Sequence, residues 1–216
     1  MGVRVYYIGL IWIYSEKSVY FPITMKSGEI TILQTPDKAL KTICKDLTPT
    51  EIASAKIQKV LKEMRQALAE SGDGVAIAAP QIGHTVRIFM VAGSILDHIN
   101  NYHGEHVSPD KVFINPEIIK ASKVKKAMRG EGCLSVRYIY GTTKRSEKVT
   151  VKAIDENGNE FMMTGSGLLS QIFQHEIDHL NGILFIDHAH DIREMGDEEK
   201  HDYQIELNRM RAERMH

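Results

Sequence analysis

Two histidines four residues apart, His175 and His179, stand in the run QHEIDHLNG, with Glu176 directly after the first of them. On a helix, residues four apart share one face at about 5–6 Å between Cβ atoms, so both imidazoles can point at one ion. Glu176 is rotated by about 100° from His175, so its carboxylate can reach a water bound to the ion without ligating the ion. This arrangement is typical of a metal-assisted hydrolase. The alternative is a pair of exposed helical histidines beside a solvated glutamate.

A catalytic metal site needs a third protein ligand and an open position for water. Cys133, within the run RGEGCLSV, offers that ligand, because a thiolate binds such ions strongly and the ion itself lowers the thiol pKa. The glycines on either side of Glu131 indicate a close approach of the backbone to another group. A single cysteine is otherwise often a small buried apolar residue, and Cys44 is given that interpretation.

A third segment, GVAIAAPQIG at residues 74–83, is rich in small residues that let the backbone come close to another group. Gln81 near its end offers a side-chain amide that could donate to a developing oxyanion. Taken alone, the segment is equally typical of a turn that leads into the following strand.

Together the three segments resemble peptide deformylase. That family carries the patterns G-x-G-x-A-A-P-Q, E-G-C-x-S and Q-H-E-x-D-H in this order, and this chain places its versions at residues 74–81, 131–135 and 174–179. The resemblance extends from about residue 30 to residue 188. It implies a hydrolase of N-terminal processing in protein biosynthesis, which removes the formyl group from the formylmethionine of newly made polypeptides.

The resemblance also implies one divalent metal ion, expected to be Fe²⁺, held by Cys133, His175 and His179. A ligand set of two histidines and one cysteine also accepts zinc, nickel or cobalt, and the order of affinities does not fix which ion a cell loads. Glu176 would take a proton from the attacking water and later deliver it to the leaving amine.

Two further roles follow from the same motifs. Gln81 and the backbone N–H of Leu134 would stabilise the tetrahedral oxyanion. The residues expected to bind the substrate, an N-formylmethionyl peptide, are Gly74, Val75, Ala76, Glu131 and Gly132. The backbone around several of them would pair with the peptide as a neighbouring strand does.

Three positions depart from the family pattern. Ala76 stands at a usual glycine, Arg137 stands where a proline often follows EGCLSV, and GSG at residues 165–167 replaces a segment that usually carries an acidic residue. Asp178, inside the histidine motif, is expected to hold an imidazole or an arginine such as Arg129.

Two other functions compete with the leading one. The first is a zinc endopeptidase, because H-E-x-x-H also marks that class; Cys133 in its E-G-C-L-S setting and the Gln81 segment argue against it. The second is a deformylase-like module that binds peptide N-termini with little turnover, which the three departures motivate.

Composition narrows the possible partners and the compartment. The chain has 216 residues, a formal net charge of −1 and 43% apolar residues, which suits one domain with a real core. The near-neutral charge gives no reason to expect nucleic acid or anionic lipid. A basic run at residues 123–126 would suit a contact with the ribosome or simply a solvated loop. Two cysteines are too few for a disulfide framework, which favours a reducing compartment, the cytoplasm.

The N-terminal residues are unusual. VRVYYIGLIWIY, at residues 3–14, is apolar and aromatic but shorter than the roughly 20 residues that span a bilayer. No small-x-small cleavage site follows it, so export is not favoured. We expect either an added strand or residues upstream of a natural start at Met25.

Hydrophobic patterning indicates which elements position these motifs. A short strand followed by a Pro-bearing turn is expected at residues 30–40, further strands at 86–92, 111–119, 147–155 and 159–165, and helices at 48–71 and from about 166. An Asn157–Gly158 turn joins the last two strands. The fold class is therefore α+β, with small antiparallel or mixed sheets around a central helix that carries the H-E-x-x-H-type motif.

Three parts of the chain are expected from these boundaries. Residues 1–29 form an extension outside the resemblance, residues 30–190 form the catalytic domain, and residues 191–216 form a charged, solvated helical tail. Residues 98–110 are expected to be an irregular insertion.

Overall fold

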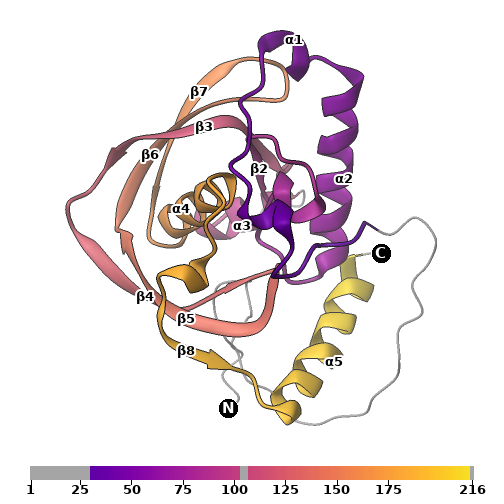
Figure 1. Cartoon of the computed structure of the whole chain (residues 1–216), viewed down its shortest axis with the longest axis vertical. Helices are drawn as coiled ribbons and strands as arrows, with labels where there is room; N and C mark the ends of the chain where they lie inside the picture. The colour runs from indigo at the N-terminus through magenta and orange to yellow at the C-terminus, as the bar shows by residue number, and fades with distance from the viewer. Residues whose placement is uncertain (1–29, 103–106, 215–216) are drawn as a thin grey trace.

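The computed structural model describes residues 30–102 and 107–214, and it confirms an α+β fold built from antiparallel sheets (Figure 1). The N-terminal residues 3–14, for which an added strand is one expectation, lie outside the described part. Among the described residues, no helix is both long and apolar enough to cross a membrane.

A five-stranded antiparallel sheet forms one side of the molecule, in the order β1-β2-β3-β6-β7. Its strands are β1 (Ala76–Ala78), β2 (Ile88–Val91), β3 (Lys111–Ala121), β6 (Lys148–Ile154) and β7 (Glu160–Ser166). The strands expected from residue 86 onward in this sheet are confirmed. The turn between β6 and β7 is also confirmed, because Gly158 adopts the positive φ of 85° that such a turn favours.

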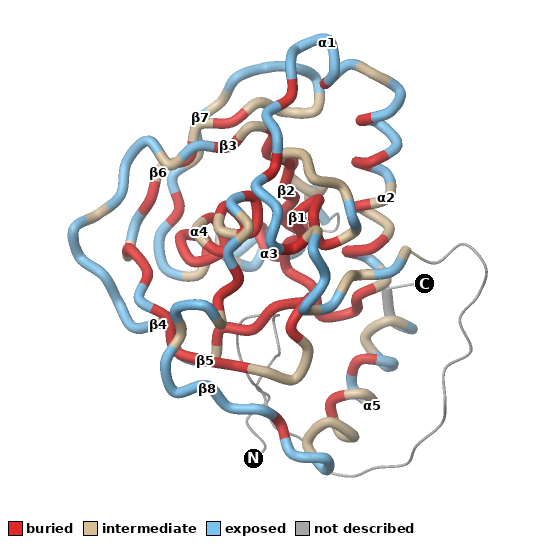
Figure 2. The backbone as a smooth tube through the Cα atoms, viewed as in Figure 1, coloured by how far each residue is buried: buried red, intermediate tan, exposed pale blue. Residues whose placement is uncertain are grey.

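A three-stranded antiparallel sheet of order β4-β5-β8 faces the first. Its strands are β4 (Lys125–Cys133), β5 (Val136–Ser146) and β8 (His190–Glu194). The helix α4 (Leu168–Leu180) contacts strands of both sheets and lies at the centre of the fold (Figure 1). The expected central helix with the histidine motif is therefore present, and Figure 2 shows that most of it is buried.

The remaining helices lie around this core. They are α1 (Pro49–Ile52), α2 (Ala55–Ser71), α3 (Gly93–Ile99) and α5 (Asp197–Arg214), with short 3-10 helices at Lys38–Lys41, Ala79–Ile82 and Phe185–Asp187. The expected irregular insertion at residues 98–110 thus begins inside α3. Its residues 103–106 lie outside the described part of the chain.

The expected single helix at residues 48–71 is two helices. Thr48 caps the first, and its capping box with Glu51 is formed, with the Thr48 N–H donating to the Glu51 carboxylate at 2.7 Å. Ser54 then caps a second helix, because its side chain accepts a hydrogen bond from the N–H of Ile57. Serine competes well for a cap position, so the chain restarts there.

Of the short strand and Pro-bearing turn expected at residues 30–40, the turn at Thr35 and Pro36 is present but the strand is wrong. The segment is irregular and ends in a 3-10 helix, and its backbone bonds go to two different partners. The Leu33 N–H donates to the Gln81 carbonyl at 2.8 Å, and the Thr35 N–H donates to the Ser135 carbonyl at 3.0 Å. A strand needs consecutive hydrogen bonds to one neighbouring strand, and this segment has no such neighbour. It instead lies across the segments that contain Gln81 and Ser135.

The helical tail expected at residues 191–216 begins instead in strand β8, and its helix α5 is present but is not solvated on all sides. Tyr203 and Leu207 are buried, and they pack with Met195 and Tyr140 in a small apolar cluster. The expectation of a solvated tail overlooked these apolar side chains, which sit among many charged neighbours. The boundaries proposed at residues 29 and 190 stay predictions.

An aromatic stack attaches α4 to the larger sheet. The rings of Phe89 and Phe113 are stacked with centroids 4.4 Å apart, and Phe173 of α4 meets Phe113 edge-on at 5.2 Å. All three side chains are fully buried. This packing fixes the height and rotation of the helix that carries the histidines.

Replacing Phe173 with alanine should lower the free energy of unfolding by about 3–5 kcal/mol, because it removes a large buried ring and leaves a cavity. Urea denaturation measures the loss. Met162→Ala on exposed β7 is the control, with an expected change within about 0.5 kcal/mol. A loss below about 1 kcal/mol for Phe173→Ala would show that the stack does not secure α4.

Candidate active site

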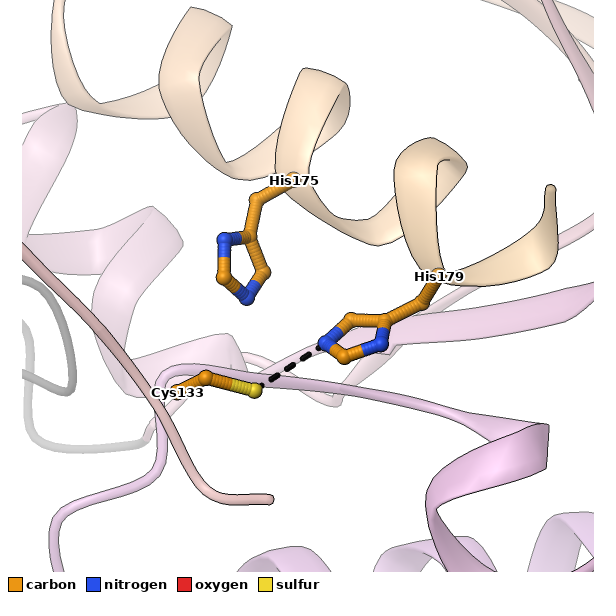
Figure 3. Close-up of side chains that lie close together, drawn as sticks. All are labelled: Cys133, His175 and His179. Carbon is orange, nitrogen blue, oxygen red and sulfur yellow. Dashed lines mark hydrogen bonds between the residues drawn. The ribbon is translucent and has the colours of Figure 1, made fainter. Parts of the chain in front are cut away.

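The three proposed metal ligands converge in one buried cluster. One ligand atom from each of Cys133, His175 and His179 lies within 4.8 Å of the other two. The Cys133 sulfur is 3.1 Å from Nε2 of His179, and the two imidazole rings are 4.9 Å apart at their centroids. Figure 3 shows both rings projecting from the same face of α4 toward the cysteine.

Local structure explains this convergence. The helical spacing places both histidines on the inner face of α4, where each is buried. Cys133 is the last residue of β4 and pairs with Val136 across the tight β4–β5 connection, so its side chain is delivered by a hairpin. Helix and hairpin come from opposite sides of the site.

Glu131 orients one of the ligands. Its carboxylate accepts from Nδ1 of His175 at 2.8 Å, which leaves Nε2 of that ring for the cluster. The side chain of Glu131 is fully buried and also accepts from Thr143 and Gln171. The Glu131 side chain therefore binds His175 and orients its ring. The expectation that the Glu131 backbone pairs with substrate stays a prediction.

Arg145 balances the buried charge of Glu131. It pairs with Glu131 through Nη2 and with Asp178 through Nη1, and only about 6% of its side chain is exposed. Burial alone would raise the pKa of Glu131, but the His175 hydrogen bond and Arg145 outweigh it and hold that pKa well below its usual range. Asp178 was expected to hold an imidazole or an arginine such as Arg129; the arginine is Arg145 and not Arg129, and Nε2 of His188 also lies 3.4 Å from the Asp178 carboxylate.

Glu176 lies beside the cluster in a setting that suits a proton carrier. It is buried, its Oε2 atom has no hydrogen-bond partner among the described residues, and it lines the same pocket as Cys133. Burial raises the pKa of Glu176 to about 7, and the charge of His175 opposes this shift only in part. A carboxyl group with a pKa near neutrality can both accept and return a proton.

Gln81 is held rigidly beside the cluster. Its side-chain oxygen accepts from the Ala78 N–H at 2.8 Å, and its amide nitrogen donates to the Ser135 hydroxyl at 3.1 Å and faces the Cys133 sulfur at 3.5 Å. An amide fixed in this way needs little reorganisation to bind a developing negative charge.

A small pocket joins these groups to solvent. Its lining residues are Val75, Ala76, Gln81, Gly132, Cys133, Leu134, His175 and Glu176. Most of the residues expected at the site therefore meet around one opening. Gly74 does not line it, but a Cβ at that position would fall 3.1 Å from the Leu134 side chain, so the glycine lets two pocket segments touch.

Comparison with known proteins agrees with this geometry. The family model for polypeptide deformylase matches residues 30–195, which is more than half of the chain. The chain belongs to the polypeptide deformylase family. Enzymes of this family are metal-dependent hydrolases that remove N-terminal formyl groups, and the cluster of Cys133, His175 and His179 could hold such a metal.

Individual deformylases show how far the similarity reaches. The chain is 42% identical over 156 residues to a peptide deformylase of Thermomicrobium roseum, covering 67% of this chain and 84% of the relative. It is 40% identical over 139 residues to peptide deformylase 2 of Clostridium acetobutylicum, covering 64% and 83%. A class I type b deformylase of Acinetobacter baumannii with Met-Ala-Ser bound superposes with a TM-score of 0.63 at 30% identity, covering 74% and 99%.

The structure places the three departures from the family pattern. Ala76 is a buried residue of β1 that lines the pocket. The GSG run joins β7 to α4, and Gly165 lies so close to the helix that a Cβ would fall 2.8 Å from Leu169. Arg137 turns away from the pocket into a second buried network.

Replacing Glu131 with glutamine should weaken metal affinity by about 10–100-fold, because His175 loses its charged partner. Competition with a chelator of known affinity measures this. Glu160→Gln is the control, since Glu160 pairs only with exposed Lys152 in the described network, and affinity should not change. Unchanged affinity in Glu131→Gln would show that the carboxylate does not tune the site.

Proposed function

We propose that this deformylase removes the formyl group of N-formylmethionyl peptides with the residues that converge at the pocket. The observation that carries the proposal is the buried cluster of Cys133, His175 and His179 beside the unpaired Glu176 oxygen. Two of the ligands, Cys133 and His175, line one opening together with the proton carrier and the oxyanion donors.

The donor set fits a divalent metal. Two imidazoles and one thiol are held close together, and the Glu131 bond fixes which nitrogen of His175 faces the cluster. Among the described residues three protein ligands are supplied, which leaves room for water or substrate as catalytic sites require. A metal bound there would supply Lewis acidity and lower the pKa of water. We propose Fe²⁺ as the ion, with Zn²⁺, Ni²⁺ or Co²⁺ also compatible with the ligands.

The chain's own residues account for the proton and charge movements. Glu176 accepts a proton from the attacking water while the water oxygen bonds to the formyl carbon. The amide of Gln81 and the N–H of Leu134 donate to the oxygen that becomes negative. The carbon–nitrogen bond then breaks, Glu176 returns the proton to the departing amine, and formate and a free methionyl N-terminus are the products.

The substrate chain would lie along the pocket wall formed by Val75 and Ala76 on one side and Gly132 on the other. An edge backbone can bind a peptide as an added strand. The related A. baumannii enzyme with Met-Ala-Ser bound supports a methionyl peptide as the ligand class. We further propose that the protein acts in the cytoplasm on chains leaving the ribosome, where such substrates arise, and that residues 30–190 form its catalytic domain.

One assay separates this function from its competitors. Two activities are measured in parallel: formate release from formyl-Met-Ala-Ser, and cleavage of internal bonds in a peptide whose N-terminus is blocked. A deformylase shows the first activity, and an endopeptidase shows the second. Binding of the formyl peptide without formate release would support the module with little turnover. Formate release without internal cleavage is the expected result.

Glu176→Gln should retain the metal and lose about 10²–10⁴-fold in kcat for formate release, because the glutamine cannot carry the proton. Metal analysis and turnover on the same sample measure both quantities. Loss of the metal, or turnover near that of the unmodified protein, contradicts the assigned role.

Cys133→Ser should lower metal retention and activity together, since a neutral hydroxyl is a poorer ligand than a thiolate for these ions. Cys44→Ser is the matched control, because Cys44 is buried away from the cluster and its substitution should spare metal content. If Cys133→Ser binds metal and turns over normally, the third ligand lies elsewhere.

A further inference from the structure

A buried polar network lies outside the catalytic pocket. Nη1 of Arg137 donates to both carboxylate oxygens of Asp73, at 3.1 and 2.9 Å, and also to the hydroxyl of Tyr203. The Tyr203 hydroxyl in turn donates to Asp73. The side chain of Asp73 is only 4% exposed, so its charge depends on these two partners.

The network joins three parts of the chain. Asp73 lies two residues after the end of α2 and two residues before Val75 of the pocket wall. Arg137 lies in β5, three residues after Leu134 of the opposite wall. Tyr203 belongs to α5, which lies beyond the residues that the family model matches. Each pocket wall is therefore attached at one end to the same ionic contact.

The two walls also touch each other. A Cβ at Gly74 would fall 3.1 Å from the Leu134 side chain, so the walls are already in contact there. A second small pocket is lined by Cys133 and Leu134 together with the three network residues Asp73, Arg137 and Tyr203. The Leu134 segment is also held within its length, because the Gln34 side chain donates to the Leu134 carbonyl at 2.8 Å and the Thr35 N–H donates to the Ser135 carbonyl at 3.0 Å, and the network holds the end of the segment at Arg137.

The charges favour a closed network. Burial alone would lower the pKa of Arg137, but the nearby Asp73 outweighs this and raises it, so the guanidinium stays charged. The ring of Tyr203 packs edge-on against the ring of Tyr138, with the two centroids 5.8 Å apart. This packing helps to hold the Tyr203 hydroxyl against the pair of Asp73 and Arg137. The tyrosine thereby ties α5 to both walls at once.

We propose that Asp73, Arg137 and Tyr203 are positioning residues that set the separation of the two substrate-binding walls, and that α5 is part of the apparatus that binds the peptide. This inference rests on the proposed function. The arginine at a usual proline position then has a role, because it provides the cation that connects the walls.

The test compares Tyr203→Phe with unmodified protein on formyl-Met-Ala-Ser, well below the unfolding temperature. KM should rise about 3–10-fold, the range of one lost hydrogen bond, while kcat and metal content change less than about 2-fold. A merely structural role would reduce the folded fraction, which lowers apparent kcat and metal content and leaves KM unchanged. That pattern would overturn the proposal.

Matched variants sharpen the comparison. Tyr138→Phe keeps the ring that packs against Tyr203 and removes only a hydroxyl that accepts from Gln204, so KM should not change. Arg137→Gln should raise KM more than Tyr203→Phe does, and Arg137→Lys should recover part of the loss by keeping the charge beside Asp73. Equal KM values for Arg137→Gln and Arg137→Lys would contradict the proposal.

A binding measurement separates this inference from the proposed function. The dissociation constant of the product peptide Met-Ala-Ser, measured by calorimetry, should rise with KM in Tyr203→Phe. If the unmodified protein releases no formate, the proposed function fails, and the dissociation constant alone decides the inference. Equal dissociation constants in Tyr203→Phe and unmodified protein would overturn the inference while leaving deformylation intact.

Discussion

The site depends on one buried carboxylate. Glu131 accepts from His175, pairs with Arg145 and, through that arginine, is linked to Asp178 on α4. Side chains from β4, β5 and α4 thus meet on a single negative charge that has no contact with solvent. A buried charge of this kind is tolerated only when its partners are all in place, so its satisfaction requires the hairpin and the helix to dock in one arrangement.

Much of the site could be predicted because its chemistry is local in sequence. The i and i+4 spacing of His175 and His179 needs only a helix, and the helix pattern was strong. The capping box at Thr48 and the turn at Gly158 were equally local, and both are present. For the same reason the expected strands of the larger sheet from residue 86 onward were placed within a few residues, whereas the three strands of the smaller sheet were not predicted.

Long-range partners could not be predicted in the same way. Nothing near Asp178 in sequence identifies Arg145 as its partner, since the two are joined only when β5 packs against α4. The segment at residues 30–40 has the apolar pattern of a strand, but the fold offers it two separate partners instead of a ladder. The burial of Tyr203 was hidden by the many charges on the rest of its helix.

The proposed metal ligands come from two different parts of the fold. Cys133 ends a strand of the smaller sheet, whereas His179 lies on a helix that the Phe173 ring attaches to the larger one, and 46 residues separate the two ligands in sequence. An ion held by both is therefore a cross-link between the halves of the molecule, and it closes a long loop in the chain. By mass action, loading the centre shifts the unfolding equilibrium of the entire domain toward the native state.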